Sequence, residues 1–130
     1  MHPRDIRTVQ ISESTHVIDG NRIVDIQELI LAVDVGITDY SSWIFDFVLT
    51  GNPGFVYAPD VEEYEEDTGF YYPLSECPFP VTNSNEQLSK AIRSFQHENY
   101  AMDVKTFLRK RGCWEDGHAA ERCVRLIENL

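Results

Sequence analysis

The sequence predicts an α/β domain in which a Rossmann-like parallel sheet is flanked by helices. Stretches with the helical spacing of apolar residues alternate with short apolar runs of strand length. An order of helix, strand, helix, strand and helix is typical of a parallel sheet with crossovers. The length of 130 residues and the hydrophobic content of 42% predict one globular domain over residues 1–130. About three strands can be counted, so the Rossmann-like domain is expected to be partial.

The first half of the chain holds the predicted strands. Apolar residues at helical spacing predict an amphipathic helix over residues 23–32. The apolar run 34–38 is expected to be a strand that is buried on both faces. A second helix is predicted to open at residues 39–42 and to end near Thr50, before Gly and Pro. The remaining strands are predicted at 54–58 and, within 8–19, around Val17 and Ile18.

The second half of the chain is predicted to be mainly helical. Residues 61–80 are acidic and aromatic and contain several Gly and Pro, which predicts a short helical turn followed by a surface loop. Thr82 or Ser84 is placed to cap a helix over about 85–97. Two further helices are predicted over about 101–111 and 117–128, the last with Asp116 as its cap.

The charge of the chain is strongly negative and unevenly distributed. Eleven Lys and Arg stand against 22 Asp and Glu, and this net charge of −11 argues against a nucleic-acid partner. From Ile23 to Ser89 there is no Lys or Arg, although 13 acidic residues fall in this segment. An anion bound here would have to be held by backbone N–H groups, hydroxyls and a helix dipole, with His or Arg contributed from elsewhere in the fold. For most of the carboxylates, a solvated face is the simpler interpretation.

The sequence contains no strong signal for a membrane span, a secretion signal or a metal site. No apolar run approaches the roughly 20 residues that span a bilayer, and residues 1–5 lack the apolar core of a signal peptide. Cys77, Cys113 and Cys123 form no CxxC pair, which indicates reduced thiols in a cytoplasmic protein. The spacing of His118 between two of these cysteines fits no standard zinc pattern.

The turn Asp39-Tyr40-Ser41-Ser42 is the strongest candidate site. It follows a predicted parallel strand, and open α/β sheets bind ligands at the carboxyl ends of their strands. The helix that begins there offers unpaired N–H groups, and the two adjacent hydroxyls can donate hydrogen bonds to phosphate oxygens. Serine is also a preferred N-cap residue, so a purely structural capping role is the alternative.

His2 and Asp46 are further candidates. His2 precedes a proline that restricts its backbone, and its imidazole could donate to a phosphate or steady a leaving group. A histidine that is merely exposed is the alternative. Asp46 lies between Phe45 and Phe47 in an otherwise apolar helix, so it is expected to be a buried carboxylate that needs a partner. It would either bond the neighbouring backbone or help to orient the ligand loop.

Several of these segments together resemble one protein family. The matching motifs are His2-Pro3, Asp39-Tyr40-Ser41-Ser42, Pro59-Asp60 with Glu63-Tyr64, Gly69-Phe70-Tyr71, and Asp116-Gly117 with Glu121-Arg122. In this order the chain resembles the carboxyl-terminal donor-binding domain of the CDP-glycerol glycerophosphotransferases. This family comprises teichoic acid primases and polymerases of Gram-positive bacteria. The combination of motifs is far more specific than any one of them.

The resemblance implies a GT-B-type enzyme with two Rossmann-like domains and a donor site in the cleft between them. Glycerol phosphate would pass from CDP-glycerol, or ribitol phosphate from CDP-ribitol, to a lipid-linked acceptor, and CMP would leave. The acceptor site and the general base are expected to belong to an amino-terminal domain. The full-length protein would be cytoplasmic and peripherally associated with the inner face of the plasma membrane. The resemblance calls for no cofactor and no protein-held metal.

The same resemblance assigns roles to individual residues. His2 would be catalytic and would contact the pyrophosphate of the donor, and Arg4 would contact its phosphates. Ser41 and Ser42 would bind the donor phosphates together with the adjacent helix start. Residues that could support the donor site are Asp39, Tyr40, Asp46 and Asp116.

Four positions depart from the family pattern. Gly36 and Gly54 stand where larger apolar residues are usual, and they are expected to weaken the packing of their strands. Asn52 and Thr68 stand where basic residues are frequent, which removes positive charge near a diphosphate site. The chain begins at the His-Pro motif, which in the family follows an acceptor domain and the earlier half of the donor domain. It is therefore expected to be a fragment that cannot turn over alone. The alternative is a non-catalytic nucleotide-binding or interaction module of the same fold.

Overall fold

The computed structural model describes residues 16–20 and 23–130, and the chain divides into two compact units. The first unit comprises residues 1–33 and the second comprises residues 34–130. In the first unit, α1 (Ile26–Ala32) begins where the Asp25 side chain accepts a hydrogen bond from the Gln27 N–H at 2.8 Å. This cap explains why the helix starts at Ile26 rather than at Ile23.

The second unit is a parallel sheet with flanking helices. Its strands lie in the order β1-β2-β3 and are β1 (Gly36–Thr38), β2 (Gly54–Tyr57) and β3 (Val81–Thr82). The helices and 3-10 turns are α2 (Trp43–Phe47), η2 (Val48–Thr50), α3 (Val61–Asp67), η3 (Leu74–Glu76), α4 (Asn85–Arg93), α5 (His97–Lys110) and α6 (Ala119–Glu128). The predicted α/β class with a parallel sheet is thus confirmed.

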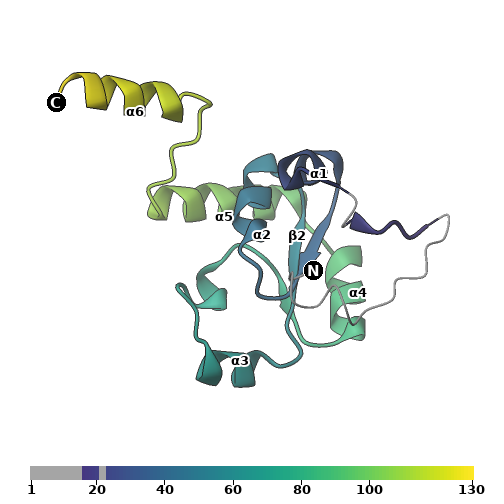
Figure 1. Cartoon of the computed structure of the whole chain (residues 1–130). Helices are drawn as coiled ribbons and strands as arrows, with labels where there is room; N and C mark the ends of the chain where they lie inside the picture. Colours follow the sequence, from purple (N-terminus) through teal and green to yellow (C-terminus); the bar gives the residue numbers. More distant parts are fainter. Residues whose placement is uncertain (1–15, 21–22) are drawn as a thin grey trace. The chain divides into compact units, whose positions relative to one another are not determined.

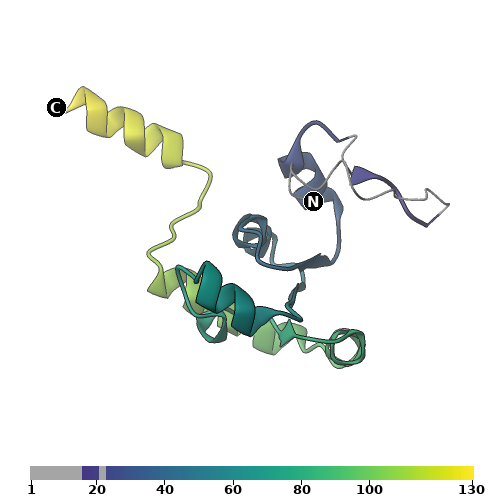
Figure 2. The same ribbon diagram turned by 60° about the horizontal axis from the view of Figure 1, so that its bottom comes forward.

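The strand register places two turns of the chain beside each other. β1 pairs with β2 through Gly36↔Gly54 and Thr38↔Val56, and β2 pairs with β3 through Val56↔Val81. Because all three strands are parallel, their carboxyl ends share one edge of the sheet. Figure 1 shows α3 beyond this edge, and the turned view of Figure 2 brings it to the front. The turns after β1 and β2 therefore meet at the place where the sequence predicts a ligand.

The core of the second unit lies between β2, α2 and α5, which Figure 1 shows close together. Phe47, Val48, Phe55 and Val56 are the largest side chains that are fully buried. The core cluster consists of Ile44, Val48, Val56, Ala58, Phe79, Tyr100 and Val104. Gly51, in the left-handed conformation with φ 75°, ends η2 as the sequence predicts.

Two predictions about the strands are corrected. β1 is buried on one face only, because Ile37 is 48% exposed while Gly36 and Thr38 are buried. The third strand of the sheet is β3, which the sequence analysis did not predict. Around Val17 and Ile18 no strand is present in the described residues, where Val17 makes an isolated bridge and residues 8–15 lie outside the description.

The boundary between α4 and α5 also differs from the prediction. α4 ends at Arg93 and α5 begins at His97, so the break comes earlier than the predicted gap after 97. Phe95 lies in this break, and its ring packs at 5.4 Å from that of Phe55 and at 5.1 Å from that of Tyr100. Tertiary packing of one aromatic residue therefore sets the boundary, which helical periodicity alone does not reveal.

Gly36 and Gly54 were expected to weaken the packing of their strands, but the structure shows close packing at both positions. A Cβ at Gly36 would lie 2.8 Å from Phe47 and 3.0 Å from Trp43, because their rings occupy the space beside the strand. A Cβ at Gly54 would lie 3.1 Å from the ring of Phe79. Aromatic side chains fill the volume that larger strand residues would take, so close packing is maintained.

Candidate functional site

The serine turn, which we define as Asp39–Ser42, connects β1 to α2 at the carboxyl edge of the sheet. Ser41 and Ser42 are both exposed. Ser42 stands at the N-cap of α2 but makes no side-chain capping bond. Within the described residues, neither hydroxyl has a hydrogen-bond partner. Capping, the structural alternative for these serines, therefore does not account for the hydroxyls.

The backbone of the serine turn directs hydrogen-bond donors outward. The carbonyl groups of Ser41 and Ser42 accept from the N–H groups of Ile44 at 3.5 Å and Phe45 at 3.0 Å. In the described part of the chain, the N–H groups of Ser41, Ser42 and Trp43 have no intramolecular acceptor. Two hydroxyls and a helix start with free N–H groups therefore lie together, and such an arrangement attracts anions.

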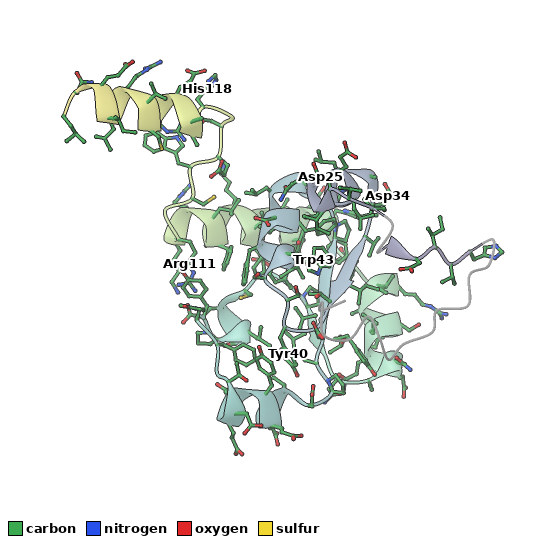
Figure 3. All side chains as sticks on the ribbon, viewed as in Figure 1. Asp25, Asp34, Tyr40, Trp43, Arg111 and His118 are labelled. Atoms are coloured by element: carbon green, nitrogen blue, oxygen red, sulfur yellow. The ribbon has the colours of Figure 1, made fainter. Side chains whose placement is uncertain are left out.

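Tyr40 fixes the serine turn to the neighbouring crossover. Its hydroxyl donates a hydrogen bond to Asp60 Oδ1 at 2.6 Å, and its N–H donates to Asp39 Oδ1 at 2.7 Å. Its ring stacks on Tyr64 of α3, with centroids 3.7 Å apart and planes inclined by 16°. The ring of Phe70 lies 5.8 Å from that of Tyr40 and 5.3 Å from that of Tyr64. Figure 3 shows Tyr40 between the rest of the second unit and α3.

The environment of Tyr40 keeps its hydroxyl protonated. Burial is the largest cause that raises the pKa of Tyr40, and the hydrogen bond to Asp60 is the second. Both causes act in the same direction because a phenolate would lose solvation and would face a carboxylate. Tyr40 is thus a permanent donor to Asp60 at physiological pH, and its hydroxyl is engaged in this contact.

No site role was predicted for Asp60, Tyr64 or Phe70. Asp60 lies in the short turn between β2 and α3, directly after Pro59 and before α3 begins at Val61. All three residues do occur in the motifs that carried the family resemblance, so a signal was present. Local pattern could not indicate that they contact Tyr40, because the contact spans 20 residues and depends on the register of β1 and β2.

Asp46 is exposed, and the expectation of a buried carboxylate is wrong. Ile44 and Phe47 are the buried residues of α2, and Val48 follows in η2. Residues three and four apart share a face of a helix, so Asp46 lies away from the face that these three residues form. The flanking Phe residues therefore do not draw Asp46 into the core.

Asp116 makes its contacts near the start of α6. Its Oδ1 accepts from the His118 N–H at 3.0 Å and from Arg122 Nη1 at 2.6 Å. The hydrogen bond from Arg122, followed by that from His118, lowers the pKa of the Asp116 carboxyl. The N-cap residue of α6 is His118, so Asp116 satisfies a helix-start N–H from two residues upstream. The remaining predicted site residues, His2 and Arg4, lie outside the described residues.

The segment from Ile23 to Ser89, which contains the serine turn, has no Lys or Arg. Lys110 at the end of α5 and the following Arg111 both lie 2.9 Å from Glu76 Oε2, and the Arg111 guanidinium stacks 3.6 Å from the ring centre of Tyr72. These two cations are therefore engaged with η3 and the loop before it. Among residues 16–20 and 23–130, no three His, Cys, Asp or Glu side chains gather as metal ligands. None of the described helices has the length and apolarity needed to cross a membrane.

Comparisons with known proteins point to one family over nearly the whole chain. Residues 1–129 match the family model described as CDP-glycerol:poly(glycerophosphate) glycerophosphotransferase. The chain is 31% identical over 131 aligned positions to a teichoic acid ribitol-phosphate primase of Bacillus spizizenii, covering 100% of this chain and 33% of the relative. It is 34% identical over 113 positions to a teichoic acid poly(glycerol phosphate) polymerase of Bacillus subtilis, covering 84% of this chain and 15% of the relative.

Solved structures agree with these sequence matches. A variant of the wall teichoic acid polymerase TagF superimposes with a TM-score of 0.72 at 28% identity, covering 92% of this chain and 31% of the polymerase. Another variant of that polymerase, soaked with CDPG, gives a TM-score of 0.69 at 28% identity over 86% of this chain and 29% of the polymerase. The chain thus spans a third or less of the length of these relatives.

Proposed function

The chain belongs to the CDP-glycerol:poly(glycerophosphate) glycerophosphotransferase family, and we propose that it forms the donor-binding part of a teichoic acid phosphotransferase. Its relatives include both ribitol-phosphate and glycerol-phosphate enzymes of teichoic acid synthesis. The donor is CDP-glycerol, with CDP-ribitol as the related alternative, and the polyol phosphate passes to a lipid-linked acceptor as CMP leaves. The whole enzyme, of the GT-B type, works at the cytoplasmic face of the plasma membrane.

One observation carries the assignment of the donor site to the serine turn. Ser41 and Ser42 present two exposed hydroxyls without intramolecular partners in the described part of the chain, beside free N–H groups at a helix start. No Lys or Arg occurs between Ile23 and Ser89, so this segment can contribute only neutral donors to a diphosphate, and any cation must come from elsewhere in the chain. Hydrogen bonds to ionised phosphate oxygens are stronger than those between neutral groups. Such donors suit a ligand whose charge is concentrated on a few oxygens.

The proposed chemistry is displacement at phosphorus. In phosphoryl transfer, positioning of the reacting groups and stabilisation of charge supply most of the catalysis. Ser41 and Ser42 hold the phosphates of the donor and stabilise the negative charge that builds up as CMP departs. The family resemblance assigns contacts with the pyrophosphate to His2 and Arg4, which lie outside the described residues. Asp39 holds the backbone of Tyr40 and supports the turn from within.

A titration followed by NMR tests this proposal directly. The ¹⁵N-labelled 130-residue chain is titrated with CDP-glycerol, CDP-ribitol and, as a control ligand, cytidine. The amide signals of Ser41, Ser42 and Trp43 are expected to shift with the two CDP-polyols and to remain unchanged with cytidine. If neither CDP-polyol shifts these signals at concentrations of several millimolar, the chain does not bind the donor through this turn.

A double variant measures the contribution of the hydroxyls. Ser41→Ala with Ser42→Ala removes two hydrogen bonds to a charged ligand, each worth about 1.5–3 kcal/mol, so affinity should fall by about 100-fold or more. The matched control is Ser75→Ala with Ser89→Ala, which removes two exposed hydroxyls elsewhere and should leave the dissociation constant unchanged. Equal affinity of the two double variants would contradict the assignment.

A further inference from the structure

The serine turn has few hydrogen bonds of its own to fix its shape. Among the described residues, its internal side-chain contact is the bond from the Tyr40 N–H to Asp39 Oδ1, between adjacent residues. Toward the residues that the structure describes, the two hydroxyls and the N–H groups that would face a ligand make no hydrogen bond. A turn of this kind samples several backbone conformations unless a side chain is anchored elsewhere. The anchor of the turn is therefore as important as its donors.

The anchor is provided by the crossover that follows β2. Tyr40 reaches Asp60 at the start of α3 with its hydroxyl and lies face to face with Tyr64 one helical turn further on. Phe70 closes the cluster from the segment after α3. The other α3 residues carry five carboxylates, at Glu62, Glu63, Glu65, Glu66 and Asp67, all of them exposed. Apart from Val61, Tyr64 is thus the α3 residue that is turned inward, and it meets Tyr40.

We propose that Asp60 and Tyr64 are positioning residues, which act through Tyr40 to hold Ser41 and Ser42 in the geometry that binds the donor diphosphate. This inference rests on the proposed function of the serine turn and assigns α3 a part in it. The aromatic stack fixes the direction of the Tyr40 side chain, and the hydrogen bond to Asp60 fixes its end. Because Tyr40 directly precedes Ser41, the backbone of the serines is held from one side by α3 and from the other by α2.

The expected consequence of losing the anchor is weaker binding rather than loss of the binding groups. Ordering the backbone of the turn on binding has an entropic cost, so a turn that must be ordered by the ligand binds about tenfold more weakly or worse. The chemistry of the donors is unchanged, because Ser41 and Ser42 remain. Loss of the anchor should therefore lower the affinity and also increase the motion of the turn without ligand. Loss of a donor group would lower the affinity alone, so a measurement of this motion distinguishes the two.

Substitutions at the two anchor residues test the proposal, each with a conservative partner. Tyr64→Ala removes the stack, whereas Tyr64→Phe keeps it, since the Tyr64 hydroxyl makes no hydrogen bond in the described part of the chain. Asp60→Ala removes the acceptor of the Tyr40 hydroxyl, whereas Asp60→Asn keeps an acceptor oxygen. Tyr71→Ala is the matched control for the loss of a tyrosine ring, because Tyr71 is 102% exposed. Asp67→Ala is the control for the loss of a negative charge on α3.

Two readouts are taken for every variant: the dissociation constant for CDP-glycerol and the NMR order parameters of the Ser41 and Ser42 amides without ligand. Tyr64→Ala should raise the dissociation constant about tenfold and lower the order parameters from about 0.85 toward 0.6. Tyr64→Phe and Asp60→Asn should stay within about twofold of the unmodified chain. The two controls should change neither readout.

The outcomes separate the positioning role from the proposed function. If the unmodified chain does not bind CDP-glycerol, the proposed function fails, and the order parameters alone then decide whether α3 positions the turn. If Tyr64→Ala leaves both readouts unchanged, or if Tyr64→Phe weakens binding as much as Tyr64→Ala, the positioning role is wrong. If Tyr64→Ala does not fold, Tyr40→Phe and Asp60→Ala decide the question, because both leave the stacked rings in place. An unchanged dissociation constant and unchanged order parameters in both would overturn the proposal.

Discussion

Ser42 and Ser84 both stand at the N-cap of a helix, but in the described part of the chain only the Ser84 hydroxyl has a hydrogen-bond partner. At the start of α4, the Ser84 backbone is extended, and its hydroxyl accepts from the Gln87 N–H at 3.4 Å. The Gln87 side chain in turn accepts from the Asn83 N–H at 3.1 Å, which completes a capping arrangement. At the start of α2, the Ser42 backbone is already helical, with φ −66° and ψ −13°, and its hydroxyl caps nothing.

This difference shows how a helix start can serve either structure or recognition. A serine in extended conformation turns its hydroxyl back toward the free N–H groups of its own helix. A serine with helical backbone angles cannot do so, and the hydroxyl and the N–H groups both remain available to a ligand. The residue type is the same in both cases, so the backbone conformation decides the role. We therefore expect substitutions of the two serines to affect different properties of the protein.

Replacement of Ser42 should give the largest effect in this comparison. Ser42→Ala removes one hydrogen bond to a charged ligand, worth about 1.5–3 kcal/mol, and should lower the affinity for CDP-glycerol at least about tenfold. Because the hydroxyl caps nothing, the free energy of unfolding should change by less than about 0.5 kcal/mol. Calorimetric titration and urea unfolding of the same variant measure the two quantities. A clear loss of stability with unchanged affinity would mean that Ser42 is a structural cap after all.

Replacement of Ser84 should lower the stability of the protein and leave its affinity for the donor nearly unchanged, and this effect should be smaller than that of Ser42→Ala. Ser84→Ala leaves the Gln87 N–H without its capping acceptor, which should lower the free energy of unfolding by about 1 kcal/mol. The affinity for CDP-glycerol should remain within about twofold of that of the unmodified chain, since Ser84 follows β3 rather than β1 and its hydroxyl is bonded to the Gln87 N–H. The same two measurements apply. A loss of affinity as large as that of Ser42→Ala would remove the distinction between the two serines.

The sequence predicted the serine turn and its surrounding strands because local signals coincide there. A short apolar run, a polar turn and an amphipathic segment follow one another, and Gly51 with Pro53 ends the helix. β3 could not be predicted in this way. Its two residues, Val81 and Thr82, form a strand because they pair with Val56 and Tyr57, and no local pattern marks so short a strand. Elements that are fixed by a partner distant in sequence leave little trace in their own residues.

In the candidate site, too, features set by adjacent residues could be predicted, whereas contacts between distant residues could not. The serine pair and its position before α2 are evident from adjacent residues. The anchor formed by Asp60 and Tyr64 depends on the register of two parallel strands, which the sequence does not specify. The predicted burial of Asp46 was wrong for a related reason, because two aromatic neighbours suggest burial although helical geometry turns the residue between them outward.

The start of α6 is the third helix start to compare, and here the expected effect, a dependence of local stability on pH, is the smallest. Before α6 the Asp116 carboxylate accepts from the N–H of the N-cap residue His118, and its pKa is lowered from 3.8 mainly by Arg122 and then by this N–H. A group with a lowered pKa in the folded chain stabilises it above the ordinary pKa, and this contribution is lost as the pH falls through the lowered value. A serine hydroxyl does not titrate in this range, so α4 should not share this loss.

Hydrogen exchange at two equivalent amides can detect this difference. The Arg122 N–H bonds to the His118 carbonyl in the first turn of α6, and the Leu88 N–H bonds to the Ser84 carbonyl in the first turn of α4. After correction for intrinsic exchange rates, protection of Arg122 should decrease below about pH 3.8, whereas protection of Leu88 should not. Asp116→Asn should abolish the pH dependence at Arg122, because its side chain does not titrate. A parallel decrease at both amides would instead indicate general acid unfolding, in which the chemistry of the individual cap has no part.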